Sequence, residues 1–112
     1  MCTKKQLDEI SSLVVDSYRR TFGDSIWKIV LYGSYARGTN DDESDIDYAC
    51  IANGERMDLQ RKVKSVWHDA ANIGMEYGVY ISPKIIPLDE FVRYRTELPY
   101  YRNIEREGIQ IG

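Results

Sequence analysis

The feature that most constrains the fold of this chain is a pair of apolar segments. The connection between them begins with glycine and ends with aspartates. Residues 26–32 are rich in β-branched and aromatic side chains and predict a strand, and Gly33 and Ser34 follow at once. Ten residues then separate Ser34 from Asp45, and a second apolar segment begins around Asp47. This order predicts two strands linked by a tight turn and a polar loop, with small and acidic residues brought to one edge.

The small residues after the first strand have the properties of a phosphate-binding turn. Gly33 lets the backbone turn sharply and lets an anion approach the main chain, and Ser34 adds a hydroxyl and an N–H group. If residues 35–38 form a helical turn, its free N–H groups also point toward the anion. Arg37 offers a charged fork to phosphate oxygens. The chemistry therefore makes Gly33, Ser34 and Arg37 candidate phosphate-binding residues.

The two aspartates form a candidate metal site. Residues two apart in a strand point to the same face, roughly 6–7 Å apart, so Asp45 and Asp47 can hold one or two Mg²⁺ ions. Such ions bridge carboxylates to a triphosphate and reduce its charge repulsion toward a nucleophile. A calcium-binding loop of the EF-hand type is a weaker alternative, because the residues after Asp47 lack the required third ligand and glycine.

The complete pattern resembles that of the nucleotidyltransferase superfamily typified by DNA polymerase beta, and especially its small stand-alone members, the minimal nucleotidyltransferases. The resemblance implies an α/β (α+β) fold, in which helices cover a small mixed β-sheet. It makes Asp45 and Asp47 the catalytic and metal-binding residues and adds Gly38 and Ser44 to the nucleotide-binding set. The residues that carry it are Gly33, Ser34, Gly38, Ser44, Asp45 and Asp47.

One departure from the family pattern concerns catalysis. Active members usually carry a third carboxylate on a later strand, whereas residues 80–87 contain neither Asp nor Glu. Alternation along that strand places Ser82 or Lys84 at the corresponding position. The nearby acids, Glu76, Asp89 and Glu90, lie outside the strand. The resemblance therefore supports nucleotide binding more firmly than turnover.

Two functions follow from this resemblance. The first is a Mg²⁺-dependent enzyme that binds a nucleoside triphosphate, with ATP expected, and transfers AMP to a hydroxyl of a partner protein. The alternative is a non-catalytic antitoxin that neutralises a HEPN-type toxin by binding it. The tyrosines around Tyr94, Tyr100 and Tyr101 belong either to the core, which is the favoured interpretation, or to an interface that also includes the apolar tail 109–112. A homo-oligomer stays open as a further possibility.

Length and composition exclude several other classes. A chain of 112 residues with 43% apolar and 29% charged residues predicts one globular domain over 1–112. The net charge of −3 argues against strong nucleic-acid binding. No segment approaches the ~20 apolar residues of a membrane span, and the start lacks a signal-peptide pattern, so we expect a cytoplasmic protein without membrane contact. Two scattered cysteines and one histidine predict no zinc site.

Apolar periodicity and capping signals predict the remaining elements. Thr3 and Gln6 form a capping-box pattern before a helix over 3–22, for which Gly23 is a stop signal. Gly74 is the corresponding stop signal for the next helix. Pro83 predicts an edge strand. The full set is helix 3–22, strands 26–32 and 46–52, helix 57–73, strand 79–86, a short helix near Leu88 and a last helix opened by Pro99.

Overall fold

The computed structural model describes residues 2–112 and places a four-stranded mixed sheet at the centre of the molecule. The strand order across the sheet is β3-β2-β1-β4. β1 pairs antiparallel with β2 and with β4, whereas β2 and β3 run parallel. The mixed sheet predicted from the sequence is therefore confirmed. The strands are β1 (Ile26–Tyr32), β2 (Ile46–Ala52), β3 (Ile81–Pro87) and β4 (Ile109–Gln110).

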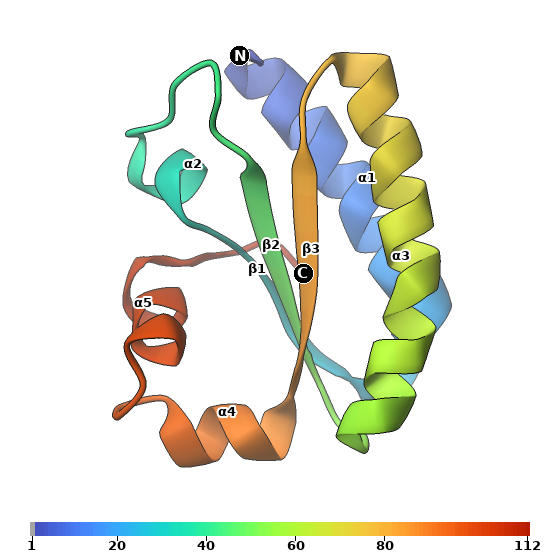
Figure 1. Ribbon diagram of the computed structural model, residues 1–112, viewed down its shortest axis with the longest axis vertical. Coiled ribbons are helices and arrows are strands. Elements are labelled where there is room, and N and C mark those ends of the chain that lie inside the picture. The colour runs from blue at the N-terminus through green and yellow to red at the C-terminus, as the bar shows by residue number, and fades with distance from the viewer. Residues whose placement is uncertain (1) are drawn as a thin grey trace.

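The helices divide between the two faces of this sheet. In Figure 1, α1 and α3 lie side by side to the right of the strands, while α2, α4 and α5 lie to the left or below. The long helices cover one face, and α4 and α5 cover part of the other, whereas α2 contributes Tyr35 to the same apolar cluster as α1 and α3. The helices are α1 (Lys4–Phe22), α2 (Ser34–Arg37), α3 (Arg56–Tyr77), α4 (Leu88–Tyr94) and α5 (Pro99–Glu107).

Alternation along the strands builds a separate apolar cluster on each face. The larger cluster joins α1 and α3 to the sheet and includes Ile10, Tyr18 and Val63, all almost fully buried. Cys50 belongs to it as a small apolar side chain, as predicted, and burial raises the pKa of its thiol to about 12. The smaller cluster lies against α4 and α5 and consists of Val30, Ala49, Ile51, Ile86, Phe91 and Ile104.

The first helix forms where its sequence signals place it. The Thr3 hydroxyl accepts the Gln6 N–H at 3.1 Å, and the Gln6 side chain accepts the Thr3 N–H at 2.9 Å. These two bonds satisfy donors that the helix itself leaves free. Gly23 ends the helix with a φ of 52°, a conformation that favours glycine. The capping box and the stop are both confirmed.

The third helix runs beyond the predicted stop. Gly74 lies inside α3, and a side chain there would overlap the carbonyl oxygen of Val79. Gly74 is thus required for close packing of the returning chain, while Gly78, with a φ of 69°, ends the helix. The prediction that Gly74 ends the helix was wrong, because a local sequence signal cannot distinguish a glycine used for a cap from one used for close approach.

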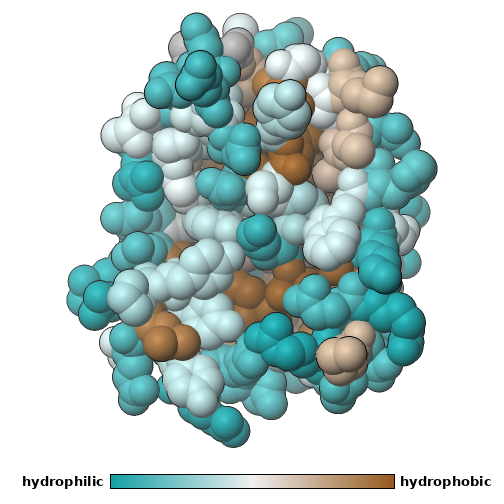
Figure 2. Space-filling model, viewed as in Figure 1, coloured by the Kyte–Doolittle hydropathy of each residue, from teal (hydrophilic) through white to brown (hydrophobic). Residues whose placement is uncertain are grey.

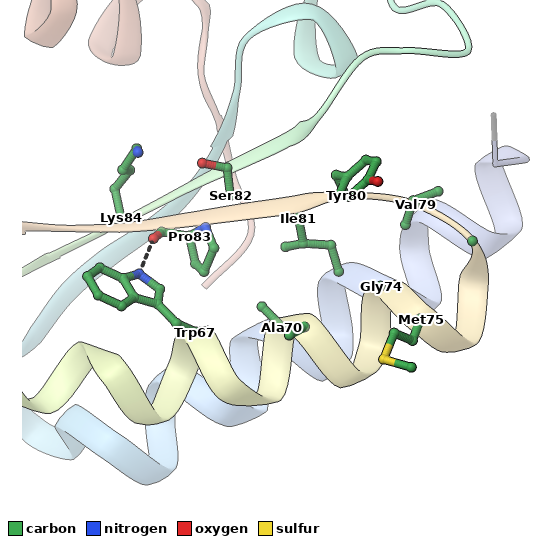
Figure 3. Close-up of a pocket in the computed structure, with 12 residues that line it drawn as sticks. Trp67, Ala70, Gly74, Met75, Val79, Tyr80, Ile81, Ser82, Pro83 and Lys84 are labelled. Carbon is green, nitrogen blue, oxygen red and sulfur yellow. Dashed lines mark hydrogen bonds between the residues drawn. The ribbon is translucent and has the colours of Figure 1, made fainter.

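The third strand begins two residues later than predicted and lies at an edge of the sheet, as Pro83 indicated. Trp67 of α3 is 44% exposed, so it is only partly buried. The Trp67 indole N–H donates to the Pro83 carbonyl at 2.9 Å, and this hydrogen bond links α3 to β3 (Figure 3).

The C-terminal tail has a structural role that the sequence analysis did not assign. Residues 109–110 pair with β1 as the fourth strand. Beyond them, the Ile111 N–H donates to the Ile29 carbonyl at 2.8 Å, and the Ile29 N–H donates to the Gly112 carbonyl at 3.0 Å. The apolar tail is thus bound to the chain's own sheet, and the prediction that its surface also contacts a partner stays a prediction.

The surface seen from the same direction is mostly polar. Figure 2 shows teal and white side chains over most of this face, with brown ones mainly in recesses between them. In the described part of the chain, residues 2–112, no helix has the length and apolar character needed to cross a bilayer.

Candidate active site

The Gly33–Ser34 turn carries the chain from β1 into a single helical turn. Gly33 has a φ of 75° and a ψ of −156°, a conformation that other residues rarely adopt. The Arg37 N–H donates to the Gly33 carbonyl at 3.1 Å, so the N–H groups of the residues between them precede the first helical bond. Gly38 ends α2 in the left-handed region, with a φ of 74°.

The aspartates lie next to this turn because of the strand register. Asp47 is paired with Tyr32 of β1, the residue immediately before Gly33. The Asp47 carboxylate packs so closely on Gly33 that a Cβ at that position would overlap its Oδ2 atom. Asp45 immediately precedes β2, and alternation directs both carboxylates to the face covered by α4 and α5. The turn and the acids are thus brought together.

The electrostatics of Asp47 indicate that burial and negative charge outweigh the nearby positive charges at this site. The carboxylate is half-buried, and this burial, together with the negative charge of Asp45, raises its pKa. The charges of Lys84 and Arg37 act in the opposite direction. Two carboxylates held close together on a partly desolvated surface are an arrangement that a divalent cation stabilises.

A pair of tyrosines beside Asp47 was not anticipated from the sequence. The hydroxyls of Tyr32 and Tyr100 are 2.8 Å apart, and their rings meet edge to face with centroids separated by 5.9 Å. Burial, the bond to Tyr100 and the charge of Asp47 raise the pKa of Tyr32, so its phenol stays protonated at neutral pH. The sequence does not link Tyr100 to the acidic site, since no local pattern reveals a contact between residues 68 positions apart.

Two of the candidate nucleotide-binding side chains are engaged elsewhere. The Arg37 guanidinium lies 3.1 Å from the Glu107 carboxylate, and both side chains are nearly half exposed. The Ser44 hydroxyl accepts the Asp41 N–H at 2.9 Å and donates to its Oδ1 atom at 3.2 Å, so it orders the loop before β2. Ligand binding by Arg37 would therefore require exchange of an exposed ion pair, which costs little.

The third strand supplies no acid to the site. Ser82 is paired with Asp47, and Lys84 is paired with Ala49 one step further along. In Figure 3, Ser82 and Lys84 point to one side of β3, whereas Trp67 and Ala70 of α3 lie on the other. Glu90 lies on α4 instead and binds Arg56 and Tyr101. Within residues 2–112, no group of three or more Asp, Glu, His or Cys side chains could hold a metal ion.

The donor set nevertheless fits Mg²⁺ bound together with a nucleotide. This ion is typically held by one or two carboxylates, with water and substrate phosphates completing its octahedron. Asp45 and Asp47 provide two hard oxygen donors on one face, beside the Gly33–Ser34 turn. Their arrangement is suited to a shared cation, whereas a closed cage of protein ligands is not available among the described residues.

A groove lies beside the acidic site on the other side of β3. It encloses about 710 Å³ between α3 and β3, and its lining includes Trp67, Gly74, Tyr80 and Pro83 but neither aspartate. The lining is mainly apolar, and β3 separates it from the side to which the acids point (Figure 3). Ser82 and Lys84 also line the groove, so it shares β3 with the acid-bearing surface, which we identify as the candidate active site.

Comparison with known proteins identifies the family. The family described as "Nucleotidyltransferase domain" matches residues 12–109, which is most of the chain. The chain belongs to this family. The resemblance noted in the sequence is therefore confirmed, and this nucleotidyltransferase has a nucleoside triphosphate as its class of substrate.

Three relatives from Methanocaldococcus jannaschii support the same assignment. Each bears the name "Putative protein adenylyltransferase". MJ0604 is 30% identical over 111 residues, covering 96% of both chains. MJ0141 is 33% identical over 88 residues, covering 79% of this nucleotidyltransferase and 81% of the relative. MJ1305 is 31% identical over 86 residues, covering 74% of this chain but only 56% of the relative.

Two solved structures share the fold. One is a crystal structure of a toxin–antitoxin with AMP-PNP, matched with a TM-score of 0.56 and 18% identity over 89% of this chain and 70% of that one. The other, a mutant of the toxin–antitoxin MntA–HpeT, has a TM-score of 0.53 and 17% identity over the same shares. At these identities the likeness concerns the fold alone, and it confirms the mixed sheet with helices.

Proposed function

We propose that this nucleotidyltransferase binds ATP with Mg²⁺ and transfers AMP to a hydroxyl group of a partner protein. The observation that carries the proposal is the placement of Asp45 and Asp47 on one face against the Gly33–Ser34 turn. The names of the three relatives support protein as the acceptor. The fold shared with toxin–antitoxin structures supports a toxin as that partner, and the resemblance noted in the sequence implies one of the helical HEPN type.

The reaction would proceed by in-line displacement at the α-phosphorus of ATP. The acceptor oxygen forms a bond to phosphorus, the bond to the bridging oxygen breaks, and pyrophosphate leaves with its electron pair while the hydroxyl proton passes to water. Gly33 allows the phosphates to approach the backbone, and Ser34 offers them an N–H and a hydroxyl. Mg²⁺, held by Asp45 and Asp47, would supply charge neutralisation for the phosphates.

A direct test uses labelled ATP and the protein encoded next to this chain. We expect one or more AMP groups on that protein, detected by mass spectrometry and localised to a side-chain hydroxyl. Asp45→Asn and Asp47→Asn should abolish labelling, while Glu43→Gln, an exposed acid in the same loop, should leave it intact. Absence of any AMP adduct with wild-type protein, ATP and Mg²⁺ would contradict the proposed transfer.

A second function is favoured by one specific observation. The strand position opposite Asp47 carries Ser82, so the third carboxylate typical of active members is missing from β3. A non-catalytic antitoxin that masks a HEPN-type toxin would tolerate this loss. The two functions separate in cells that express the toxin. If the Asp45→Asn/Asp47→Asn double variant still protects them, masking is sufficient, and if protection is lost while the complex still forms, AMP transfer is required.

A further inference from the structure

The surface around Asp47 carries a lysine next to the position where a third acid would complete a two-metal site. β3 runs parallel to β2, so its residues alternate in step with those of the acidic strand. Ser82 and Lys84 stand on the same side of β3, the side away from α3 (Figure 3). The Lys84 ammonium is close enough to Asp47 to lower the pKa of its carboxyl, and its side chain is exposed.

The fold holds the backbone of Lys84 in place, whereas the ammonium group of its side chain forms no ion pair with any described residue. The Tyr18 hydroxyl, fully buried beneath the sheet, donates to the Lys84 carbonyl at 2.7 Å and so anchors the backbone at that point. Within residues 2–112, no carboxylate lies within ion-pair distance of the Lys84 ammonium. An exposed cation on an anchored strand, beside two acids but bonded to neither, is available to an anionic ligand.

We infer that Lys84 takes the place of a second metal ion: the site binds one divalent cation, and the Lys84 ammonium contacts the triphosphate directly. This inference rests on the nucleotide-binding part of the proposed function. Charge balance supports it, since two carboxylates, one divalent cation and one ammonium carry the same net charge as three carboxylates and two divalent cations. A triphosphate therefore meets the same net charge with fewer acids and one fewer metal ion.

Lysine is suited to this role because its ammonium is a compact point charge on a flexible stem. It can follow the phosphates without the fixed geometry that a metal ion imposes on its ligands. Ser82, opposite Asp47, is too short and carries no charge with which to hold a second cation. The position that would need an acid for a second metal is thus filled by a neutral residue, and the charge comes from its neighbour.

The test measures metal stoichiometry, which does not depend on turnover. The full chain is saturated with AMP-PNP and titrated with Mn²⁺, and free Mn²⁺ is followed by electron paramagnetic resonance. We expect one bound Mn²⁺ per chain. Lys84→Gln should still bind one Mn²⁺ but weaken AMP-PNP binding roughly 10–100-fold, because a charge-assisted contact is lost. Lys64→Gln, an exposed lysine on α3, should change it by less than about twofold.

A double variant tests the reason for the single ion. Ser82→Asp/Lys84→Gln places a carboxylate opposite Asp47 and removes the competing ammonium, so we expect a second Mn²⁺ to bind. Two Mn²⁺ ions in the wild type, or unchanged AMP-PNP affinity in Lys84→Gln, would overturn the inference alone. Failure of the wild type to bind AMP-PNP with Mn²⁺ at all would overturn the proposed function as well. Urea unfolding of each variant checks that it folds.

Discussion

The two faces of the sheet differ in how fully the helices cover them. The face against α1 and α3 is packed along its whole length and includes Ile10, Tyr18 and Val63, whose side chains have almost no exposed surface. The opposite face is covered at one end by α4 and α5, and at the other it bears a half-buried Asp47 and an exposed Lys84. Apolar packing dominates the first face, and unbalanced charge marks the second.

This difference shows how a small chain can keep an unfavourable site. Bringing Asp45 and Asp47 together on a partly buried surface opposes folding, as the raised pKa of Asp47 indicates. The packed face provides stability that does not depend on the charged face. Substitutions on the packed face should therefore alter stability but not activity. Substitutions among the acids should alter activity but lower stability little or not at all.

The largest effect is expected for Asp47→Asn. We expect AMP transfer to fall by at least about 100-fold, because the metal and its charge neutralisation are lost. Stability should stay equal or rise. The folded-state pKa of Asp47 is above its unfolded value, so its ionised form opposes folding, and wild-type stability gains as pH falls through that raised pKa. Transfer assays and urea unfolding at pH 7 measure both quantities. An Asp47→Asn variant that is less stable yet active would contradict the assignment of stability to the packed face and of activity to the acid-bearing face.

A core substitution on the packed face should have the opposite profile. Ile10→Ala removes most of a fully buried side chain and leaves a cavity in its place. The free energy of unfolding should fall by about 2–5 kcal/mol. Activity per folded molecule should be retained. Leu13→Ala on the same helix, where the side chain is 39% exposed, is the matched control and should cost distinctly less. Equal costs at the two positions would contradict the assignment of this face as the main source of stability.

Gly33→Ala should affect both properties, because this residue lies where the fold meets the site. The left-handed φ costs about 1–3 kcal/mol for a residue with a side chain, and the new Cβ must also displace the Asp47 carboxylate. Nucleotide binding with Mg²⁺, followed by calorimetry, should be lost. Gly78→Ala has a similar φ but open space around it, so it should show the strain without the loss of binding. Intact binding by Gly33→Ala would refute the close contact.

The smallest effect is expected at the start of α1, on the packed side. Thr3→Ala removes the hydroxyl that accepts the Gln6 N–H and should cost about 1 kcal/mol. Thr96→Ala, in an exposed turn, serves as the control and should change stability by less than about 0.5 kcal/mol. Thermal unfolding detects both, and AMP transfer should be unaffected by either. An activity change in Thr3→Ala would show that the two faces are coupled.

Much of this fold could be predicted because its signals are local. The bounds of β1 and β2, the Gly33 turn and the capping box of α1 each depend on residues within a few positions of one another. The juxtaposition of Asp47 with the turn also follows, since a short connection between two strands favours their pairing. The position of a third acid could likewise be checked in the sequence, and the structure places Ser82 opposite Asp47.

Most of the features that were missed depend on contacts between distant residues. Arg37 meets Glu107 and Tyr32 meets Tyr100 only after α5 has packed on the sheet. The tail was interpreted as an interface because a short apolar segment does not reveal which strand it will join. Gly74 resembled a helix stop, although its real constraint is the carbonyl of Val79 across the turn. In each case the deciding atom belongs to a segment whose position is set by tertiary packing.

The two prolines of the edge strand determine how another protein can approach this molecule. The Tyr80 carbonyl accepts the Ile46 N–H, so in this parallel register the backbone groups of every second residue from Tyr80 face β2. Pro83 and Pro87 fall between these residues and face away from β2. Neither has an N–H to offer, and the Pro83 carbonyl is already bonded to Trp67. A partner strand would therefore find few hydrogen-bond donors here, since of the residues with this orientation only Ile81 and Ile85 keep an N–H, and both extension of the sheet and fibril-like stacking are disfavoured at this edge. Recognition from this side then relies mainly on side chains, so it can be altered by substitution without disturbing the backbone.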